Sequence, residues 1–165
     1  MISATNLMLL SLFLLGGAVS AAEGSDLVGR NTDVSFLAWG CRLEDGGQCR
    51  VPAFADRGVR AIAAGDGHSL VLTKDGRVVA WGCGLADWEQ CRVPASAKRG
   101  VRAIAAESPH SLALTKGGRV IAWGCGRDSD YGQCNVPTTA THGVTAIAAG
   151  FGQSLALTNG GRVIA

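Results

Sequence analysis

A strong net charge is missing from the sequence, and with it the usual sign of a nucleic-acid or membrane-surface protein. The chain has 15 Lys and Arg against 13 Asp and Glu over 165 residues. A net charge of +2 gives no electrostatic case for binding nucleic acid or an anionic membrane. Proline is also scarce, at 4 residues, and no Gly-x-y period occurs, which excludes a collagen-like chain.

What the sequence has in excess is glycine, with 24 residues. This is about twice the usual share of roughly 7%, and it indicates many tight turns rather than long helices. An apolar fraction of 47% is too high for a disordered chain. The composition therefore favours a turn-rich β protein that has a core of its own.

The first residues are typical of a targeting segment. Residues 1–22 carry no charged side chain, and an apolar run over residues 7–19 ends in small residues. This pattern predicts a secretory signal peptide over residues 1–22, cleaved after Ala21 or Ala22, and then a linker over residues 23–33. The run is shorter than the ~20 apolar residues that span a bilayer. Because no Lys or Arg precedes it, an uncleaved anchor is the alternative. We expect a secreted, extracellular protein with no membrane contact after cleavage.

The remaining sequence repeats with a period of 42 or 43 residues. The motif Gly-Val-x-Ala-Ile-Ala-Ala begins at Gly58, Gly100 and Gly143. A second motif, Ala-Trp-Gly-Cys, contains Trp39, Trp81 and Trp123. A fixed period of this size is typical of solenoids and propellers, so it outweighs any prediction made for a single element.

Each period contains three short strands, judged by its alternation and its turn residues. In the first complete repeat they cover residues 59–64, 69–73 and 77–81. Residues 74–76 join the last two strands and end in a glycine that suits a hairpin turn. Three or four strands per repeat is the pattern of a β-propeller blade, and the small Ala-rich strand fits the innermost position.

The repeat Gly-Val-x-Ala-Ile-Ala-Ala-Gly-x-x-His-Ser-Leu-x-Leu-Thr-x-x-Gly-x-Val-x-Ala-Trp-Gly, followed by Gln-x-x-Val-Pro, resembles that of the regulator-of-chromosome-condensation family. The resemblance covers roughly residues 34–165. It is closest in style to secreted bacterial members, which include an inhibitor of β-lactamases. It implies an all-β fold, a β-propeller of regulator-of-chromosome-condensation type, which has seven blades in the family. The chain departs from many members in having cysteine after Trp-Gly.

About three blades are expected, which makes a partial or truncated ring, because propellers typically close with 4–8 blades. The expected units are residues 34–57 (partial), 58–99, 100–142 and 143–165 (partial). Ala165 stands one residue before the next expected tryptophan. The alternative is a short protein that completes its ring by self-association, for example two copies making six blades.

Six cysteines fall two to a repeat. They allow fifteen disulfide connectivities, of which one bond per repeat is the simplest. That assignment pairs Cys41 with Cys49, Cys83 with Cys91 and Cys125 with Cys134. The sequence offers no Cys-x-x-Cys and no histidine at ligand spacing, so we expect no metal site, and we expect no cofactor. Free or inter-chain thiols are the remaining alternative.

The pair His68-Ser69 invites a catalytic interpretation, but it recurs as His110-Ser111 and Gln153-Ser154. A nucleophile and its base are normally assembled once, from different elements. Adjacent residues on a strand also point to opposite faces. We therefore predict a structural role for these residues, no catalytic residue and no enzymatic activity.

Differences between the repeats lie in two loops that we place on the rim of the propeller. Three aromatic residues occur in these otherwise polar segments: Trp88, Tyr131 and Phe151. Acidic residues surround them: Asp87, Glu89, Asp128 and Asp130. In the secreted inhibitor of the family, aromatic rim residues contact the partner, so the resemblance implies a binding role for these seven. The alternative is that they are ordinary loop residues that cover the ends of the blades.

The sequence thus predicts an exported, non-enzymatic β-propeller repeat protein that acts as a protein-binding module; in a narrower form of the hypothesis it inhibits a partner enzyme. One alternative is a fragment of a larger propeller whose enzymatic or glycan-binding activity lies in further blades. Another is a guanine-nucleotide exchange or chromatin-type adaptor, which requires that the protein is not exported.

Overall fold

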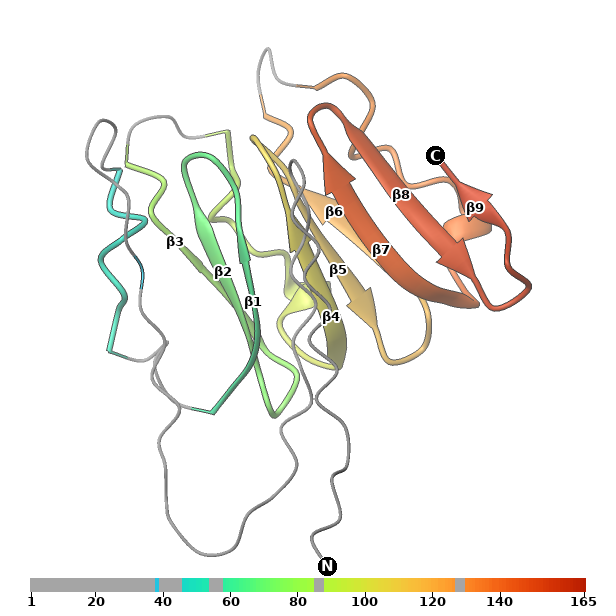
Figure 1. Cartoon of the computed structure of the whole chain (residues 1–165), viewed down its shortest axis with the longest axis horizontal. Helices are drawn as coiled ribbons and strands as arrows, with labels where there is room; N and C mark the ends of the chain where they lie inside the picture. Colours follow the sequence, from blue (N-terminus) through green and yellow to red (C-terminus); the bar gives the residue numbers. More distant parts are fainter. Residues whose placement is uncertain (1–37, 39–45, 54–57, 85–87, 127–129) are drawn as a thin grey trace, which may run out of the picture.

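The computed structural model describes residues 38, 46–53, 58–84, 88–126 and 130–165, and these residues form an all-β structure (Figure 1). They contain three antiparallel sheets of three strands each, as predicted for consecutive propeller blades. The predicted signal peptide and linker, residues 1–22 and 23–33, lie outside the described residues. In the described part of the chain, no helix is long and apolar enough to cross a membrane.

Each sheet is a meander in which the strands pair in sequence order. The first sheet contains β1 (Val59–Ala64), β2 (Ser69–Thr73) and β3 (Val78–Trp81). The second contains β4 (Val101–Ala106), β5 (Ser111–Thr115) and β6 (Val120–Trp123). The third contains β7 (Val144–Gly150), β8 (Gln153–Thr158) and β9 (Val163–Ile164). Two 3-10 turns, η1 (Ala95–Ala97) and η3 (Thr138–Ala140), connect consecutive sheets.

The hairpin between β2 and β3 also joins the first sheet to the second. Gly76 has φ +82°, which an L side chain rarely adopts, and a Cβ there would lie 3.0 Å from the Val101 carbonyl. The Gly76 carbonyl accepts a hydrogen bond from the Val101 N–H at 3.0 Å. Gly118 makes the same bond to Val144, at 3.1 Å. Glycine at this turn is therefore needed both for its conformation and for the close approach of the next sheet.

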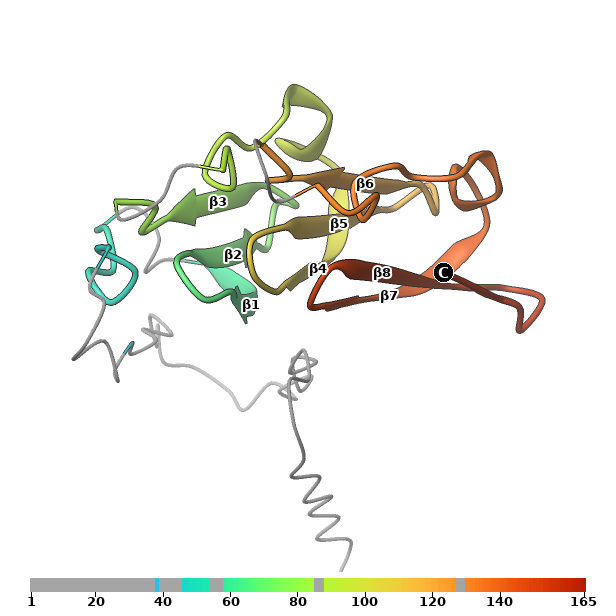
Figure 2. The ribbon, with the colours of Figure 1, turned by 90° about the horizontal axis from the view of Figure 1, so that it is seen from above.

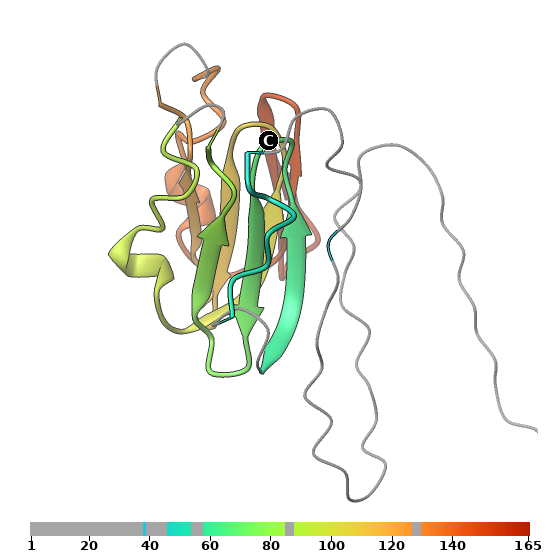
Figure 3. The same ribbon diagram turned by 90° about the vertical axis from the view of Figure 1, so that its left-hand side faces the viewer.

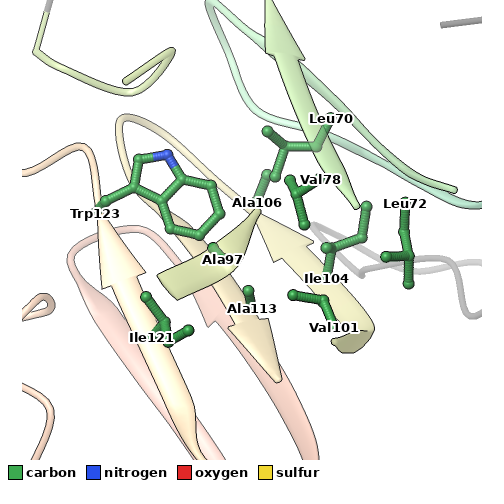
Figure 4. Packing of buried hydrophobic residues seen from close by; sticks show 10 residues of the cluster. All are labelled: Leu70, Leu72, Val78, Ala97, Val101, Ile104, Ala106, Ala113, Ile121 and Trp123. Atoms are coloured by element: carbon green, nitrogen blue, oxygen red, sulfur yellow. The ribbon is translucent and has the colours of Figure 1, made fainter. Parts of the chain in front are cut away.

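The sheets pack against one another through two hydrophobic clusters. The first lies between the first two sheets and includes Leu70, Val78 and Trp123; Figure 4 shows this packing. The second lies between the second and third sheets and includes Leu112 and Val120. The Ala-rich strands β1, β4 and β7 contact one another in order, and Figure 2 shows all three on one side of the molecule. This arrangement agrees with the predicted inner position of these strands.

The first sheet has one face turned away from the second sheet, on the side that faces the viewer in Figure 3. Ile62 in β1 is 46% exposed, whereas its counterpart Ile104 in β4 belongs to the first cluster and is 9% exposed. Self-association that covers this face of the first sheet stays a prediction. A measurement of the mass of the protein in solution tests it.

Candidate functional site

The candidate site is the rim formed by the loops at one end of the sheets, the upper end in Figure 1. Two kinds of loop meet there: the turns between the first two strands of each sheet, and the loops that follow β3 and β6. Neighbouring loops of the second kind are joined by a backbone hydrogen bond from the Gly126 N–H to the Trp88 carbonyl at 3.0 Å. The Gly84 N–H donates in the same way to the Gly46 carbonyl at 2.9 Å. The described parts of neighbouring rim loops are therefore held together by backbone hydrogen bonds.

Two of the three predicted aromatic residues are strongly exposed, and both belong to this rim. Tyr131 is 69% exposed and Phe151 is 77% exposed. The Tyr131 ring packs against Gly152, where a Cβ would lie 3.4 Å from the ring. Trp88 lies one blade earlier and is half-buried. The structure therefore brings Tyr131 together with the turn that carries Phe151, and leaves Trp88 in the preceding loop.

Two of the four predicted acidic residues, Glu89 and Asp130, have local structural partners. Glu89 has φ +68° and its carboxylate pairs with Arg92 at 2.8 Å. The Asp130 carboxylate accepts the Gly132 N–H at 2.8 Å and so stabilises its own turn. The other two predicted residues, Asp87 and Asp128, lie outside the described residues.

Buried glutamines position the rim loops, a role that the sequence interpretation did not assign. Gln90 and Gln133 are 1% and 5% exposed. The Gln90 side-chain oxygen accepts the Trp88 N–H at 2.6 Å, and that of Gln133 accepts the Tyr131 N–H at 2.6 Å. A glutamine directly before the second cysteine of each repeat was the available signal. Because this contact fixes the backbone of the aromatic residue itself, it limits the entropy that a partner must remove on binding.

Disulfide bonds close the same loops. Cys83 is bonded to Cys91 and Cys125 to Cys134, with Cα–Cα distances of 6.1 Å in both. These two predicted pairings are confirmed. Cys49 is also disulfide-bonded, and Cys41, its predicted partner, lies outside the described residues. Among the residues described, no group of three or more His, Cys, Asp or Glu side chains is placed to hold a metal ion.

Replacing both Cys83 and Cys91 by serine is expected to lower the free energy of unfolding by about 2.5 kcal/mol, because the open loop gains entropy in the unfolded chain. Urea unfolding of the variant and the unmodified protein measures the difference. The matched variant Cys125→Ser/Cys134→Ser should lose a similar amount, since its loop is only one residue longer. Unchanged unfolding midpoints in both variants would contradict a stabilising role.

The repeated histidines and serines pair between blades, not within one. The Nε2 atom of His68 lies 2.8 Å from the Ser111 hydroxyl, and that of His110 lies 3.0 Å from the Ser154 hydroxyl. The His68 ring also lies against Gly65, where a Cβ would come within 2.3 Å of it. In the sequence each histidine stands beside the serine of its own strand, and nothing there indicates a pairing between blades.

The environment of these pairs supports a structural role. His68 and Ser111 are 1% and 0% exposed, so a reactant has no access to the hydroxyl. The pKa of His68 is lowered from 6.5 to about 4, mainly by burial and also by the neighbouring His110, while Asp66 acts in the opposite direction. Burial lowers the pKa of His110 as well. Both rings are thus neutral near pH 7 and serve as links between sheets.

Tryptophan indoles make a second link between blades. Trp81 donates its indole N–H to the Gln48 carbonyl at 2.9 Å, and Trp123 donates to the Gln90 carbonyl at 2.9 Å. The loop that leaves one blade is thereby held against the last strand of the next. The rim and the core thus share the same glutamines: the side-chain oxygen of Gln90 holds Trp88, and its carbonyl holds Trp123.

Three-stranded antiparallel sheets that pack side by side and share braced rim loops are blades of a β-propeller. The family model described as "Regulator of chromosome condensation (RCC1) repeat" matches residues 59–85 and 101–133. These two segments therefore match the repeat that the sequence motifs predict. None of the curated proteins compared with the chain matches it.

Solved structures similar to this chain are RCC1-like propellers. The ectodomain of the Arabidopsis thaliana receptor kinase ACR4 is 18% identical, with a TM-score of 0.54 over 79% of this chain and 42% of that one. Prp20p from Saccharomyces cerevisiae, described with its binding to Gsp1p and histones, is 26% identical, with a TM-score of 0.48 over 65% of this chain and 32% of that one. The chain thus spans less than half the length of these proteins.

Proposed function

We propose that these RCC1 repeats form a protein-binding module whose contact surface is the rim around Tyr131 and Phe151. The single observation that carries the proposal is the exposure of these two rings, 69% and 77%, on neighbouring turns of the rim. Aromatic side chains are favoured anchors in interfaces, because they offer a large contact area for little conformational entropy. An exposed pair therefore suits recognition better than it suits the stability of the blade.

Export and a non-enzymatic role are further parts of the proposal. The two disulfide bonds are typical of proteins in an oxidising environment. An exported rim would meet extracellular partners, and a partner that is an enzyme would be inhibited if the rim covers its active site. The hypothesis that the protein inhibits a partner enzyme depends on which partner it binds. It is tested by an activity assay of that partner once the partner is identified.

The double variant Tyr131→Ala/Phe151→Ala is expected to weaken partner binding by at least about tenfold, since two anchors of a contact centre are removed. Capture from culture medium with the immobilised protein, followed by mass spectrometry, identifies the partner. Titration of the purified partner then measures the affinity. Stability should change little, because both side chains are largely exposed.

Val163→Ala is the matched control, because Val163 is an apolar side chain in β9 that is 61% exposed and lies outside the rim loops. It should capture the same partner as the unmodified protein. Equal recovery of the partner by the double variant would rule out the Tyr131 and Phe151 rim as the contact surface.

A further inference from the structure

The charged side chains are distributed unevenly between the two ends of the sheets. Four of the five acidic residues that the structure describes lie on the rim, at the upper end in Figure 1: Asp66, Glu89, Glu107 and Asp130. The opposite end carries six exposed cations, which we call the basic row: Lys74, Arg77, Lys98, Arg99, Lys116 and Arg119. The small net charge of +2 therefore results from charges of opposite sign that are separated in space.

The basic row consists of three pairs of cations on neighbouring turns. The first pair belongs to the β2–β3 hairpin, the second precedes β4, and the third belongs to the β5–β6 hairpin. Figure 1 shows both hairpins at the end away from the rim. Backbone hydrogen bonds join these turns: the Val101 N–H donates to the Gly76 carbonyl at 3.0 Å, and the Lys116 N–H donates to the Gly100 carbonyl at 2.7 Å. The three pairs therefore have a fixed order across the first two sheets.

Carboxylates do not neutralise the basic row. None of its six cations forms an ion pair with an acidic side chain in the described part of the chain. Asp75 is the one acidic residue that the structure describes at this end, and its carboxylate accepts the Thr73 hydroxyl. This hydrogen bond is the main cause that lowers the pKa of Asp75, and the charge of Arg77 contributes. The second and third hairpins have Gly117 and Gly160 at this position. Positive charge is therefore in excess at this end.

A row of exposed cations on short turns suits a polyanion that is recognised by its charge. Single-stranded nucleic acids are held largely by stacking of their bases on aromatic rings. The described Trp, Tyr and Phe residues all lie at the rim end: Trp81, Trp88, Trp123, Tyr131 and Phe151. Duplexes are recognised by a helix or strand that enters a groove, and short turns do not provide one. A sulfated polysaccharide requires only charge-assisted hydrogen bonds from guanidinium and ammonium groups to its oxyanions.

We propose that the basic row binds a sulfated polysaccharide. Sulfate groups along the glycan contact the three pairs of cations in order, across the ends of the first and second sheets. Because this surface lies at the end opposite to the rim, a bound glycan leaves the Tyr131 and Phe151 rim free for a protein partner. The proposal depends neither on export nor on partner binding by the rim.

Isothermal titration of the purified protein with a heparin oligosaccharide tests the choice of ligand. The affinity is expected to fall by about tenfold or more between roughly 0.05 and 0.2 M salt, because the contacts are exposed and are screened by ions. An unsulfated polysaccharide with the same sugar backbone should bind at least about tenfold more weakly than the heparin oligosaccharide. No binding of heparin, or equal binding of the unsulfated glycan, would overturn the proposal.

A single-stranded DNA oligonucleotide of the same total charge distinguishes a glycan site from a nucleic-acid site. It should bind more weakly than the heparin oligosaccharide, since no Trp, Tyr or Phe described at this end offers a ring on which its bases can stack. DNA that binds as tightly as heparin, or more tightly, would assign the basic row to nucleic acid and would reject the glycan.

The third repeat supplies substitutions that this turn accepts. It has Thr141 and His142 at the positions of Lys98 and Arg99, so the variant Lys98→Thr/Arg99→His is expected to fold, which its thermal unfolding checks. At about pH 7.5, where histidine is mostly neutral, the variant lacks two of the six cations of the basic row. It should bind the heparin oligosaccharide about fivefold more weakly. Unchanged affinity in this variant would show that the glycan does not contact the second pair.

Arg50→Asn/Arg92→Asn is the matched control, because it removes two cations that lie outside the basic row. The third repeat has Asn135 at this position. This control should keep its heparin affinity within about twofold, and a loss equal to that of the first variant would trace binding to net charge and overturn the proposal. The rim variant Tyr131→Ala/Phe151→Ala should also bind heparin normally. Loss of heparin binding in the rim variant would place the glycan on the rim instead of the basic row.

Discussion

Replacing Trp123 by alanine is expected to lower the free energy of unfolding by roughly 3–5 kcal/mol. The side chain is 7% exposed and lies in the cluster that joins the first two sheets, so its removal leaves a cavity between them. The indole hydrogen bond to the Gln90 carbonyl is lost at the same time. Because small domains are stable by only about 5–15 kcal/mol, this loss is a large fraction of the total stability. Urea denaturation followed by circular dichroism measures the loss.

Two controls separate the causes of this loss. Trp123→Phe keeps most of the apolar ring but removes the N–H donor, so it should cost less than Trp123→Ala. Phe151→Ala removes an aromatic ring that is 77% exposed and should change the free energy of unfolding by less than about 0.5 kcal/mol. A loss for Trp123→Ala that is no larger than that for Phe151→Ala would show that the indole does not hold the sheets together.

Acidification is expected to destabilise the protein between about pH 6.5 and pH 4, through His68. Its pKa in the folded protein is about 4, below its usual value of 6.5. In this range the unfolded chain therefore binds a proton that the folded chain does not. Stability is fully present above pH 6.5 and is lost as the pH falls toward 4. The loss is on the order of 3 kcal/mol for His68, and the lowered pKa of His110 acts in the same direction.

His68→Gln is the variant that tests this dependence, because Gln153 occupies the same position in the third repeat. An amide retains a hydrogen-bonding group toward Ser111 but does not titrate. We expect the free energy of unfolding of the variant to fall less steeply between pH 6.5 and 4.5 than that of the unmodified protein. Chemical denaturation at several pH values measures both slopes. Identical slopes would show that His68 is not buried in its neutral form.

Much of the fold could be predicted from the sequence because each blade is a local unit. Strands 59–64 and 69–73 were predicted with the bounds that the structure shows, since alternation and turn glycines act over a few residues. The pairings of Cys83 with Cys91 and of Cys125 with Cys134 were predictable for the same reason: the partners lie eight and nine residues apart. The candidate aromatic residues followed from differences between otherwise equal repeats.

Contacts between blades could not be predicted in this way. His68 meets Ser111 across 43 residues, and Trp123 meets the Gln90 carbonyl across 33. No local periodicity specifies which face of one sheet packs on which face of the next. The sequence also does not show that the side chain of Gln133 holds the backbone of Tyr131, because both residues lie in a loop with no regular pattern.

The sequence alone determined the repeat and the strands and turns of each blade, because these depend on short-range geometry. For the same reason it favoured the two disulfide pairings within loops that the structure shows. Only the tertiary structure decided how neighbouring blades are joined and which of the variable aromatic residues are exposed. These properties arise when sheets about 40 residues apart in sequence pack side chain against side chain, and such packing depends on three-dimensional position rather than on spacing along the chain.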